Sequence, residues 1–201
     1  MRVYAGSLSA ADIRQMAIQV PNGLKAYYSF SDASGGTAID YSGNGHTGTL
    51  VNAPIATADR FNVTGAYNFN SNTKAISASD TGLPAGTAPR TMCSWLRPTT
   101  LPVSGGYAIA AKYGQPMTGA ANYVGIFNNA GSMNAIYSGW GDHLNVAYTF
   151  NANVWYHICG SYDGATARLY VNGQLIGQLA KSWNTVLIGS NGIMMGRGDA
   201  T

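Results

Sequence analysis

The stretch WYHICGSYDGATARLYVNGQLIG, residues 155–177, decides the fold. From Trp155 to Tyr162 successive side chains alternate, and Asp163-Gly164 then separates this run from a second one that ends at Asn172-Gly173. Alternation with a period of two is typical of β-strands, and Asp-Gly and Asn-Gly tolerate the positive φ angles of tight hairpin turns. The stretch therefore predicts an antiparallel meander of three consecutive strands.

Three motifs resemble the laminin-G-like domains of the concanavalin A-like lectin and glucanase superfamily. The pattern Trp-x-His-x-x-x-x-Tyr-Asp-Gly followed by Leu-Tyr-Val-Asn-Gly resembles the central hairpins of that family. Residues 23–50, GLKAYYSFSDASGGTAIDYSGNGHTGTL, resemble its opening strand and loop, and residues 90–98, RTMCSWLRP, resemble its next core strand. The resemblance implies an all-β fold, a two-sheet antiparallel jelly-roll sandwich. It does not choose a function, because this fold hosts lectins, enzymes, adhesion modules and structural proteins.

Length and composition suit a single extracellular domain. A chain of 201 residues can bury a full core as one two-sheet β domain. Only 9% of the residues are charged, whereas Gly (26) and Tyr (13) are abundant, so the predicted surface is polar but weakly charged. This surface suits an extracellular location, at a cell surface or a virion surface, at least as well as the cytosol. Lys and Arg are scattered singly, and no apolar run approaches the roughly 20 residues that span a bilayer, so we expect no nucleic-acid partner and no membrane insertion.

The first 22 residues are predicted to form a separate element. Residues 1–8 have the pattern of a strand, and Ser9-Ala10-Ala11-Asp12 resembles a capping box that opens one short N-terminal helix. In laminin-G-like domains a similar segment is the last strand and the helix after it. We therefore expect residues 1–22 to be a displaced terminal strand with a short helix and linker. Residues 23–201 are then a jelly roll that lacks its own last strand.

Three explanations account for this order of elements. In the first explanation, the chain is one repeat of a tandem array, cut one strand out of phase. In the second, the strand at Met1–Leu8 closes its own domain, as in a circular permutant. In the third explanation, that strand completes the next copy by strand addition. Such a head-to-tail contact generates a filament when it does not close into a ring.

The loop at residues 31–48 contains the candidate metal ligands Asp32, Asp40 and Asn44, among five glycines. The resemblance implies a structural Ca²⁺ beside Asp40, with Asp32 as a further ligand. Ca²⁺ takes six to eight oxygen ligands, which short Asp and Asn side chains and free carbonyls can supply. The alternative is that Asp40 and Asn44 make Asx turns that hold a tight loop.

Cys93 and Cys159 both lie in the middle of predicted strands. The resemblance makes these strands antiparallel neighbours, and a similar pair of positions carries the cross-strand disulfide of the pentraxins, a branch of the same superfamily. It therefore implies a Cys93–Cys159 disulfide and an oxidising compartment. The alternative is two buried free thiols. His157, at the family's fixed His position, is expected in the core.

Residues 99–154 contain the surface that we expect to meet a ligand. Tyr113, Trp140, Asp142 and His143 lie among Gly, Asn and Ser residues. Aromatic faces stack on sugar rings and Asp side chains can hold hydroxyl groups, so these four residues form a candidate lectin-like cluster. The alternative is that the tyrosines cover the sheet or form subunit contacts, where Tyr and Trp are also enriched.

The composition argues against catalysis. The chain contains no glutamate, and its aspartates never occur at i, i+2 spacing. The paired carboxylates of the superfamily's glycoside hydrolases are therefore absent. There is also no zinc-type Cys/His spacing and no phosphate-binding Gly-rich motif. The sequence thus predicts a protein that is not an enzyme.

Two classes of function remain. The first is a non-catalytic extracellular structural or adhesive protein that assembles head-to-tail through the strand at residues 1–8. The displaced strand and the weakly charged surface favour it. The second is a calcium-assisted recognition module that binds a glycan or a partner protein. The functions common in the superfamily favour this second class. We expect the first, with glycan contact as an additional property.

Overall fold

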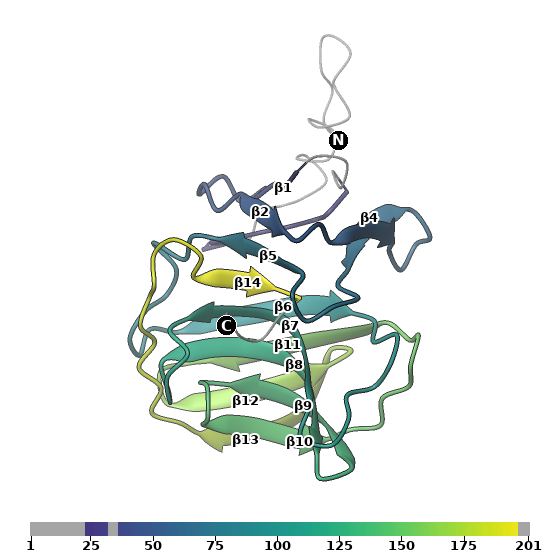
Figure 1. The fold of residues 1–201 in the computed structure, drawn as a ribbon. Coiled ribbons are helices and arrows are strands. Elements are labelled where there is room, and N and C mark those ends of the chain that lie inside the picture. The colour runs from purple at the N-terminus through teal and green to yellow at the C-terminus, as the bar shows by residue number, and fades with distance from the viewer. Residues whose placement is uncertain (1–22, 32–35, 197–201) are drawn as a thin grey trace, which may run out of the picture.

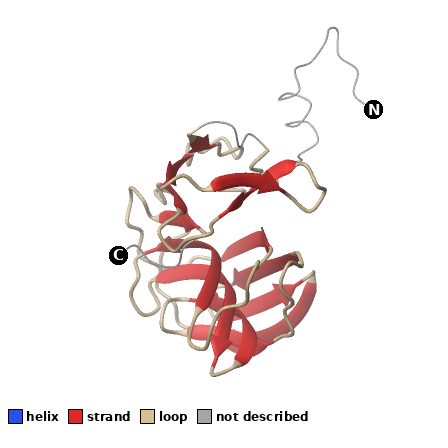
Figure 2. Ribbon diagram, turned by 45° about the vertical axis from the view of Figure 1, so that its right-hand side comes forward, coloured by secondary structure: helices blue, strands red, loops and turns tan. Residues whose placement is uncertain are grey.

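The fold consists of strands and loops. The computed structural model describes residues 23–31 and 36–196, and these ranges contain strands but no helix (Figure 2). The described residues accordingly include no helix with the length and apolar character needed to span a bilayer. The strand expected at residues 1–8 and the short helix after it lie outside the described residues.

Two sheets pack face to face, and a separate hairpin lies beside them (Figure 1). The strands of the larger sheet are, in spatial order, β1 (Thr37–Ala38), β2 (Gly48–Val51), β5 (Ala75–Ala78), β14 (Ile193–Met195), β7 (Tyr107–Gly114), β8 (Ala121–Asn129), β9 (Ser132–Ser138) and β10 (His143–Ala147). Those of the smaller sheet are β13 (Gln174–Ala180), β12 (Thr166–Val171), β11 (Tyr156–Tyr162) and β6 (Arg90–Leu96). The hairpin is formed by β3 (Ile55–Ala58) and β4 (Thr64–Asn68). All these pairings are antiparallel, which confirms the predicted two-sheet antiparallel sandwich.

The predicted meander is formed by β11, β12 and β13. The Asp163-Gly164 turn is held by the Asp163 carboxylate, whose Oδ1 accepts the N–H groups of Ala165 (3.0 Å) and Thr166 (2.8 Å). Asn172 and Gly173 have φ angles of 50° and 80°. These positive values are what a tight turn between two strands requires, and Asn-Gly is the pair that adopts them most readily. The turn chemistry of the sequence thus fixes this part of the fold.

The main core lies between the meander and the larger sheet. Ile158, Tyr162 and Leu169 are buried against residues of β8 and β9, among them Tyr137. Gly160 lies under the ring of Tyr137, and a Cβ added there would overlap that ring. Only glycine at this position lets the two sheets approach at this distance.

A second core cluster covers the other half of the larger sheet, opposite β5 and β14. Its outer layer is not a sheet but the segment 24–30, whose Ala26, Tyr28 and Phe30 side chains pack inward. The segment itself was expected to be a strand, and the structure assigns none there. Within the described residues, its backbone makes one backbone–backbone hydrogen bond, from the Tyr41 N–H to the Tyr27 carbonyl (2.8 Å). The side chains of segment 24–30 thus alternate as in a strand, although its backbone pairs with no neighbouring strand among the described residues.

The disulfide predicted from the resemblance is present. Cys93 of β6 is directly opposite Cys159 of β11 in the register, and the two residues are bonded with their Cα atoms 4.1 Å apart. Both cysteines belong to the outer face of the smaller sheet. The alternative of two free thiols is therefore excluded for the native chain.

We expect the double substitution Cys93→Ala with Cys159→Ala to lower the free energy of unfolding. The bond closes a loop with a sequence separation of 66 residues, and chain entropy predicts a loss of about 4 kcal/mol for a loop of that size. Urea unfolding measures this difference. The matched control is Thr91→Ala with Ser161→Ala, an opposed pair in the same two strands, for which we expect little change. A loss no larger than that of the control pair would contradict the prediction.

Candidate functional site

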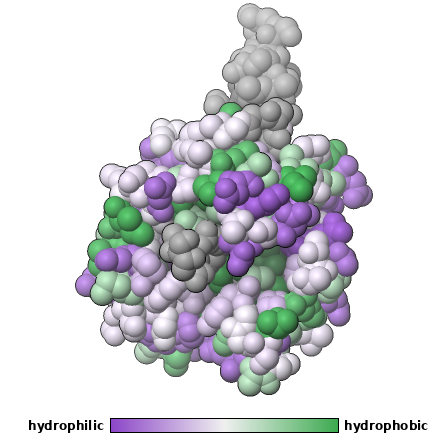
Figure 3. Space-filling view, viewed as in Figure 1, coloured by the Kyte–Doolittle hydropathy of each residue, from purple (hydrophilic) through white to green (hydrophobic). Residues whose placement is uncertain are grey.

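The outer face of the larger sheet has a group of aromatic residues that we call the aromatic patch. It consists of Tyr107 from β7, Tyr123 and Phe127 from β8, Trp140 from the turn between β9 and β10, and His143 from β10. These side chains point away from the core because their strand neighbours point into it. Figure 3 shows this face of the molecule, where strongly apolar residues occupy separate areas among polar ones.

The rings of the aromatic patch contact one another. Tyr107 and Phe127 are opposed in the register and stack with their centroids 4.4 Å apart and their planes 16° apart. Trp140 lies edge-on to Tyr123 at 6.0 Å, and His143 lies 6.4 Å from Tyr107. Tyr107 is 44% exposed, whereas Tyr123 is buried. Tyr107 is therefore the ring of the patch that is most open to a ligand.

A tight turn places Trp140 in the patch. Trp140 and Gly141 have φ angles of 59° and 67°, and the Trp140 N–H donates to Ser138 Oγ (3.0 Å). A positive φ is unusual for a large side chain and has to be held by its surroundings. Here the ring packs against Tyr123, and the Lys112 ammonium lies 5.1 Å from its centroid. These contacts fix the orientation of the indole.

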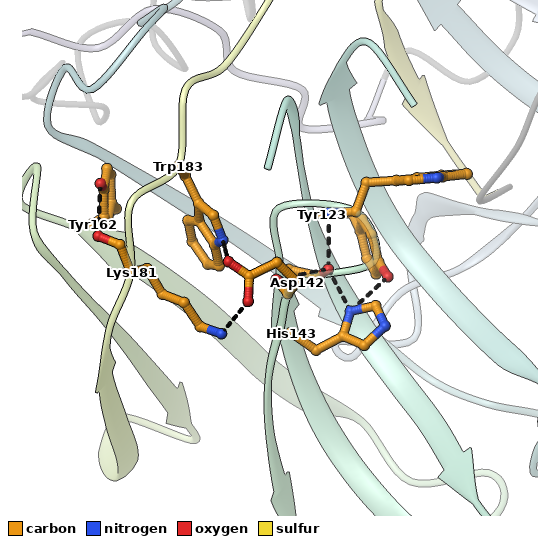
Figure 4. A network of polar contacts seen from close by, with 8 residues as sticks. Tyr123, Asp142, His143, Tyr162, Lys181 and Trp183 are labelled. Atoms are coloured by element: carbon orange, nitrogen blue, oxygen red, sulfur yellow. Dashed lines mark hydrogen bonds and ion pairs between the residues drawn. The ribbon is translucent and has the colours of Figure 1, made fainter. Parts of the chain in front are cut away.

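His143 is uncharged at neutral pH. Burial lowers its pKa from 6.5, as does the nearby positive charge of Lys181, while Asp142 acts in the opposite direction. Its Nδ1 lies 2.6 Å from Ser138 Oγ and 3.3 Å from the Tyr123 hydroxyl (Figure 4). This geometry is consistent with an Nδ1 that accepts from a hydroxyl and a proton on Nε2. The imidazole can then offer an N–H donor to a ligand.

Asp142 holds the base of the same turn. Its carboxylate forms an ion pair with Lys181 and accepts the Trp183 Nε1–H at 2.8 Å, so the turn is tied to the segment that follows β13 (Figure 4). The side chain is still 36% exposed. A carboxylate has about four acceptor positions, so two protein donors leave room for a ligand hydroxyl.

Tyr113 does not join the other predicted ligand residues. It is 5% exposed in the second core cluster, and its hydroxyl donates to the Pro84 carbonyl (3.1 Å). The reason is a β-bulge in β7 between Ile109 and Ala111. The bulge inverts the alternation, so Ile109 faces outward while Ala111 and Tyr113 face the core. The structure thus places Tyr113 apart from Trp140 and His143, and it directs the Asp142 carboxylate towards Lys181 and Trp183. Tyr107 is the accessible tyrosine of this face.

The described contacts around Asp40 match the turn alternative. Its Oδ1 accepts the N–H groups of Tyr27 (2.9 Å) and Ser42 (2.9 Å), and its Oδ2 accepts the His46 N–H (3.0 Å) and the Ser42 hydroxyl (2.8 Å). Burial alone would raise the pKa of Asp40, but these donors hold it below its usual value. With four donors in place, the carboxylate has no free position for a cation without losing one of them.

Asn44 has a similar role in that loop. Its Nδ2 donates to the carbonyls of Leu24 (3.1 Å) and Lys25 (3.0 Å), and thereby joins the loop to the segment before it. Asp32 lies outside the described residues. Asp40 thus offers no open carboxylate position to a calcium ion, and calcium binding by Asp32, Asp40 and Asn44 stays a prediction.

The outer face of the smaller sheet has its own aromatic group. Trp95 of β6 packs against His157 of β11 with centroids 5.0 Å apart and planes tilted by 34°, and the Arg60 guanidinium lies 4.6 Å from the Trp95 centroid. His157 is therefore on the outer face and not in the core as expected, because the alternation of β11 turns Ile158 inward. Burial and the charge of Arg60 lower the pKa of His157. Cys93 and Trp95 are two residues apart in a predicted strand, so both side chains lie on one face of the sheet. This spacing was the signal that could have revealed the group.

Comparisons with known proteins agree with the fold. A family model described as the concanavalin A-like lectin/glucanases superfamily matches residues 70–201. Domain 4 of AbnA, a GH43 extracellular arabinanase from Geobacillus stearothermophilus solved in complex with arabinotriose, is 16% identical with a TM-score of 0.57, over 89% of this chain and 85% of that one. The receptor binding domain of botulinum neurotoxin C/D mosaic serotype is 14% identical with a TM-score of 0.59, over 82% of this chain and 41% of that one. No curated protein sequence matches the chain significantly. At these identities the structural likeness shows the fold alone.

We expect Asp40→Ala to lower the free energy of unfolding by about 2 kcal/mol or more, because it leaves partly buried N–H groups without an acceptor. Asp59→Ala is the control, since Asp59 accepts the N–H groups of Phe61 and Val63 in an exposed turn. Added Ca²⁺ should leave the melting temperature of chelator-treated protein unchanged. A melting temperature that rises with Ca²⁺ in the native chain, but not in Asp40→Ala, would instead support the calcium alternative.

Stability should fall as the pH is lowered from about 7.5 to about 5. The folded-state pKa of His143 is below 6.5, so the unfolded chain takes up a proton at a higher pH than the folded chain does. Stability is therefore lost as the pH falls from the unfolded-state pKa towards the folded-state pKa. His157 acts in the same direction. The denaturation midpoint, measured across this pH range, should depend less on pH in His143→Gln and in His157→Gln than in the native chain. An unchanged dependence in both would refute the assignment.

Proposed function

Because the chain belongs to the concanavalin A-like lectin and glucanase superfamily, we propose that it is a non-catalytic extracellular binding module that holds a glycan on the aromatic patch. The observation that carries this proposal is the accessible ring of Tyr107, fixed by its stacking on Phe127 and flanked by polar groups. A rigid aromatic face beside a few oriented polar groups is the usual composition of a sugar site.

One polar side chain, that of His143, lies beside that ring, with the two ring centroids 6.4 Å apart. His143 and Asn145 are two residues apart on β10, so both side chains point to the outer face, and Asn145 is exposed. The Nε2–H of His143 and the amide of Asn145 can bond to sugar hydroxyls. The separate apolar areas on this face (Figure 3) suit a small polar ligand better than a broad apolar protein interface.

The described carboxylates support a non-catalytic role. Asp59 and Asp163 hold turns, and Asp40 holds the loop before β2. Asp80 is fully buried and accepts the N–H groups of Gly114, Ile188 and Gly189. Asp142 is paired with Lys181. Each described carboxylate is thus engaged by structural donors, whereas a glycoside hydrolase needs two that face the scissile bond.

Extracellular location is supported by the disulfide, since such bonds persist in oxidising compartments. Arabinotriose is a suitable first probe, because the arabinanase domain with this fold was solved with that sugar. A glycan array extends the search to other sugars. Incubation with arabinan should release no reducing ends if the module is non-catalytic.

We expect Tyr107→Ala to weaken binding of the best array sugar by roughly 2- to 12-fold, the range given by the loss of one aromatic stacking contact. Trp95→Ala is the matched control, because Trp95 is 43% exposed on the opposite face and its removal should leave affinity unchanged. Calorimetry measures both. Equal affinities for Tyr107→Ala and the native chain would place the ligand elsewhere, and a loss confined to Trp95→Ala would move the site to the smaller sheet.

A second candidate is head-to-tail assembly through residues 1–8 of a neighbouring copy. One observation favours it: β6 is the edge strand of the smaller sheet, so its outer side has no strand partner among the described residues. An unpaired edge is a template for strand addition.

Light scattering tests this assembly. We expect the native chain to form large polymers, and a chain lacking residues 1–8 to remain a folded monomer. Val3→Pro with Ala5→Pro keeps the segment but prevents its pairing as a strand, so this variant should match the truncated chain. A native chain that is monomeric at all concentrations would exclude the assembly without affecting the glycan proposal.

A further inference from the structure

The outer face of the smaller sheet brings together three side chains that can bind a metal ion. Cys93 of β6 is opposite Cys159 of β11, and His157 is two residues before Cys159, so all three point to the same face. Their ligand atoms all lie within 4.8 Å of one another. We refer to these three residues as the sulfur site.

The distances in the sulfur site are close to those of a zinc centre. Cys159 Sγ lies 3.8 Å from His157 Nδ1 and 3.7 Å from Nε2. A tetrahedral zinc ion with ordinary bond lengths separates a sulfur and a nitrogen ligand by roughly 3.6 Å. Because the sulfur is almost equally far from both ring nitrogens, the imidazole has to turn to direct one lone pair at an ion. Trp95 packs against the ring on the same face of the sheet.

The sulfur site is open to solvent. A shallow depression of about 400 Å³ contains it, lined by Thr91, Cys93, His157, Cys159, Ser161, Tyr170 and Gly173. A tetrahedral ion needs its two sulfur ligands roughly 3.8 Å apart. After reduction, rotation about the Cα–Cβ bonds can provide this separation, because the space above the strands is not filled. The same opening leaves a fourth position for water.

We propose that reduction of the Cys93–Cys159 disulfide creates a Zn²⁺ site with the two thiolates and His157 as protein ligands. A phosphine together with water, or a dithiol, supplies two electrons and two protons. The S–S bond breaks, two thiols form, and the reductant becomes a phosphine oxide or a disulfide. Binding of Zn²⁺ then displaces one proton from each thiol, and water takes the fourth position. The oxidised chain has no thiolate to offer, so metal binding at this face depends on the redox state.

Cobalt(II) reports on this site because a tetrahedral Co²⁺–thiolate centre has intense visible bands and a near-ultraviolet charge-transfer band. The full chain is reduced with a phosphine, its fold is checked by circular dichroism, and Co²⁺ is titrated. We expect these bands to saturate at one equivalent, to disappear when Zn²⁺ is added, and to be absent from the oxidised chain. Cys93→Ser should lose most of the charge-transfer intensity.

His157→Gln tests the third ligand, and His143→Gln on the opposite sheet is its matched control. We expect the first variant to bind Co²⁺ at least about tenfold more weakly than the reduced native chain, with shifted visible bands, and the control to bind as the native chain does. Equal binding by His157→Gln and the native chain would overturn the proposal. A reduced chain that has lost its fold, or a spectrum of octahedral Co²⁺ alone, would also overturn it.

Discussion

The register of β6 against β11 is the constraint on which the rest of the structure depends. It pairs Cys93 with Cys159 and at the same time turns Ile158 and Tyr162 towards the larger sheet. Because alternate residues of a strand point to opposite faces, a slip of one residue would exchange the core and the surface of both strands. The disulfide and the inward side chains therefore specify the same register independently.

The close contact between the sheets follows from that register. Gly160 is opposite Met92 in β6 and lies beneath Tyr137 of β9. The Tyr137 ring fills the space that a larger residue would occupy, and it packs edge-on against Trp183 at 4.9 Å. Trp183 in turn donates to Asp142, which holds the turn that bears Trp140. A glycine in the core is thus linked by direct contacts to the aromatic patch on the outer face.

The predictable parts of the fold are those with a local signal. Asp-Gly and Asn-Gly fixed the meander, and alternation placed Ile158 and Cys159 on opposite faces. The β7 bulge lies where two alanines, Ala110 and Ala111, are adjacent, and such a pair does not by itself indicate a change of face. Tyr113 was expected on the surface because it lies among Gly, Asn and Ser residues. His157 was misplaced for a different reason: its position was taken from the resemblance, although the alternation of β11 itself turns it outward.

Exposure alone does not make an aromatic residue a binding site, as the two sheets illustrate. Trp95 and Tyr107 are exposed to almost the same extent, 43% and 44%. Trp95, however, is already in contact with the Arg60 guanidinium and packed against His157, so a ligand would have to displace a charged group from its ring. Tyr107 stacks on Phe127, with His143 to one side at 6.4 Å. A ring that is stacked on one face and exposed on the other needs little rearrangement to contact a sugar, and this difference favours the larger sheet for the proposed glycan site.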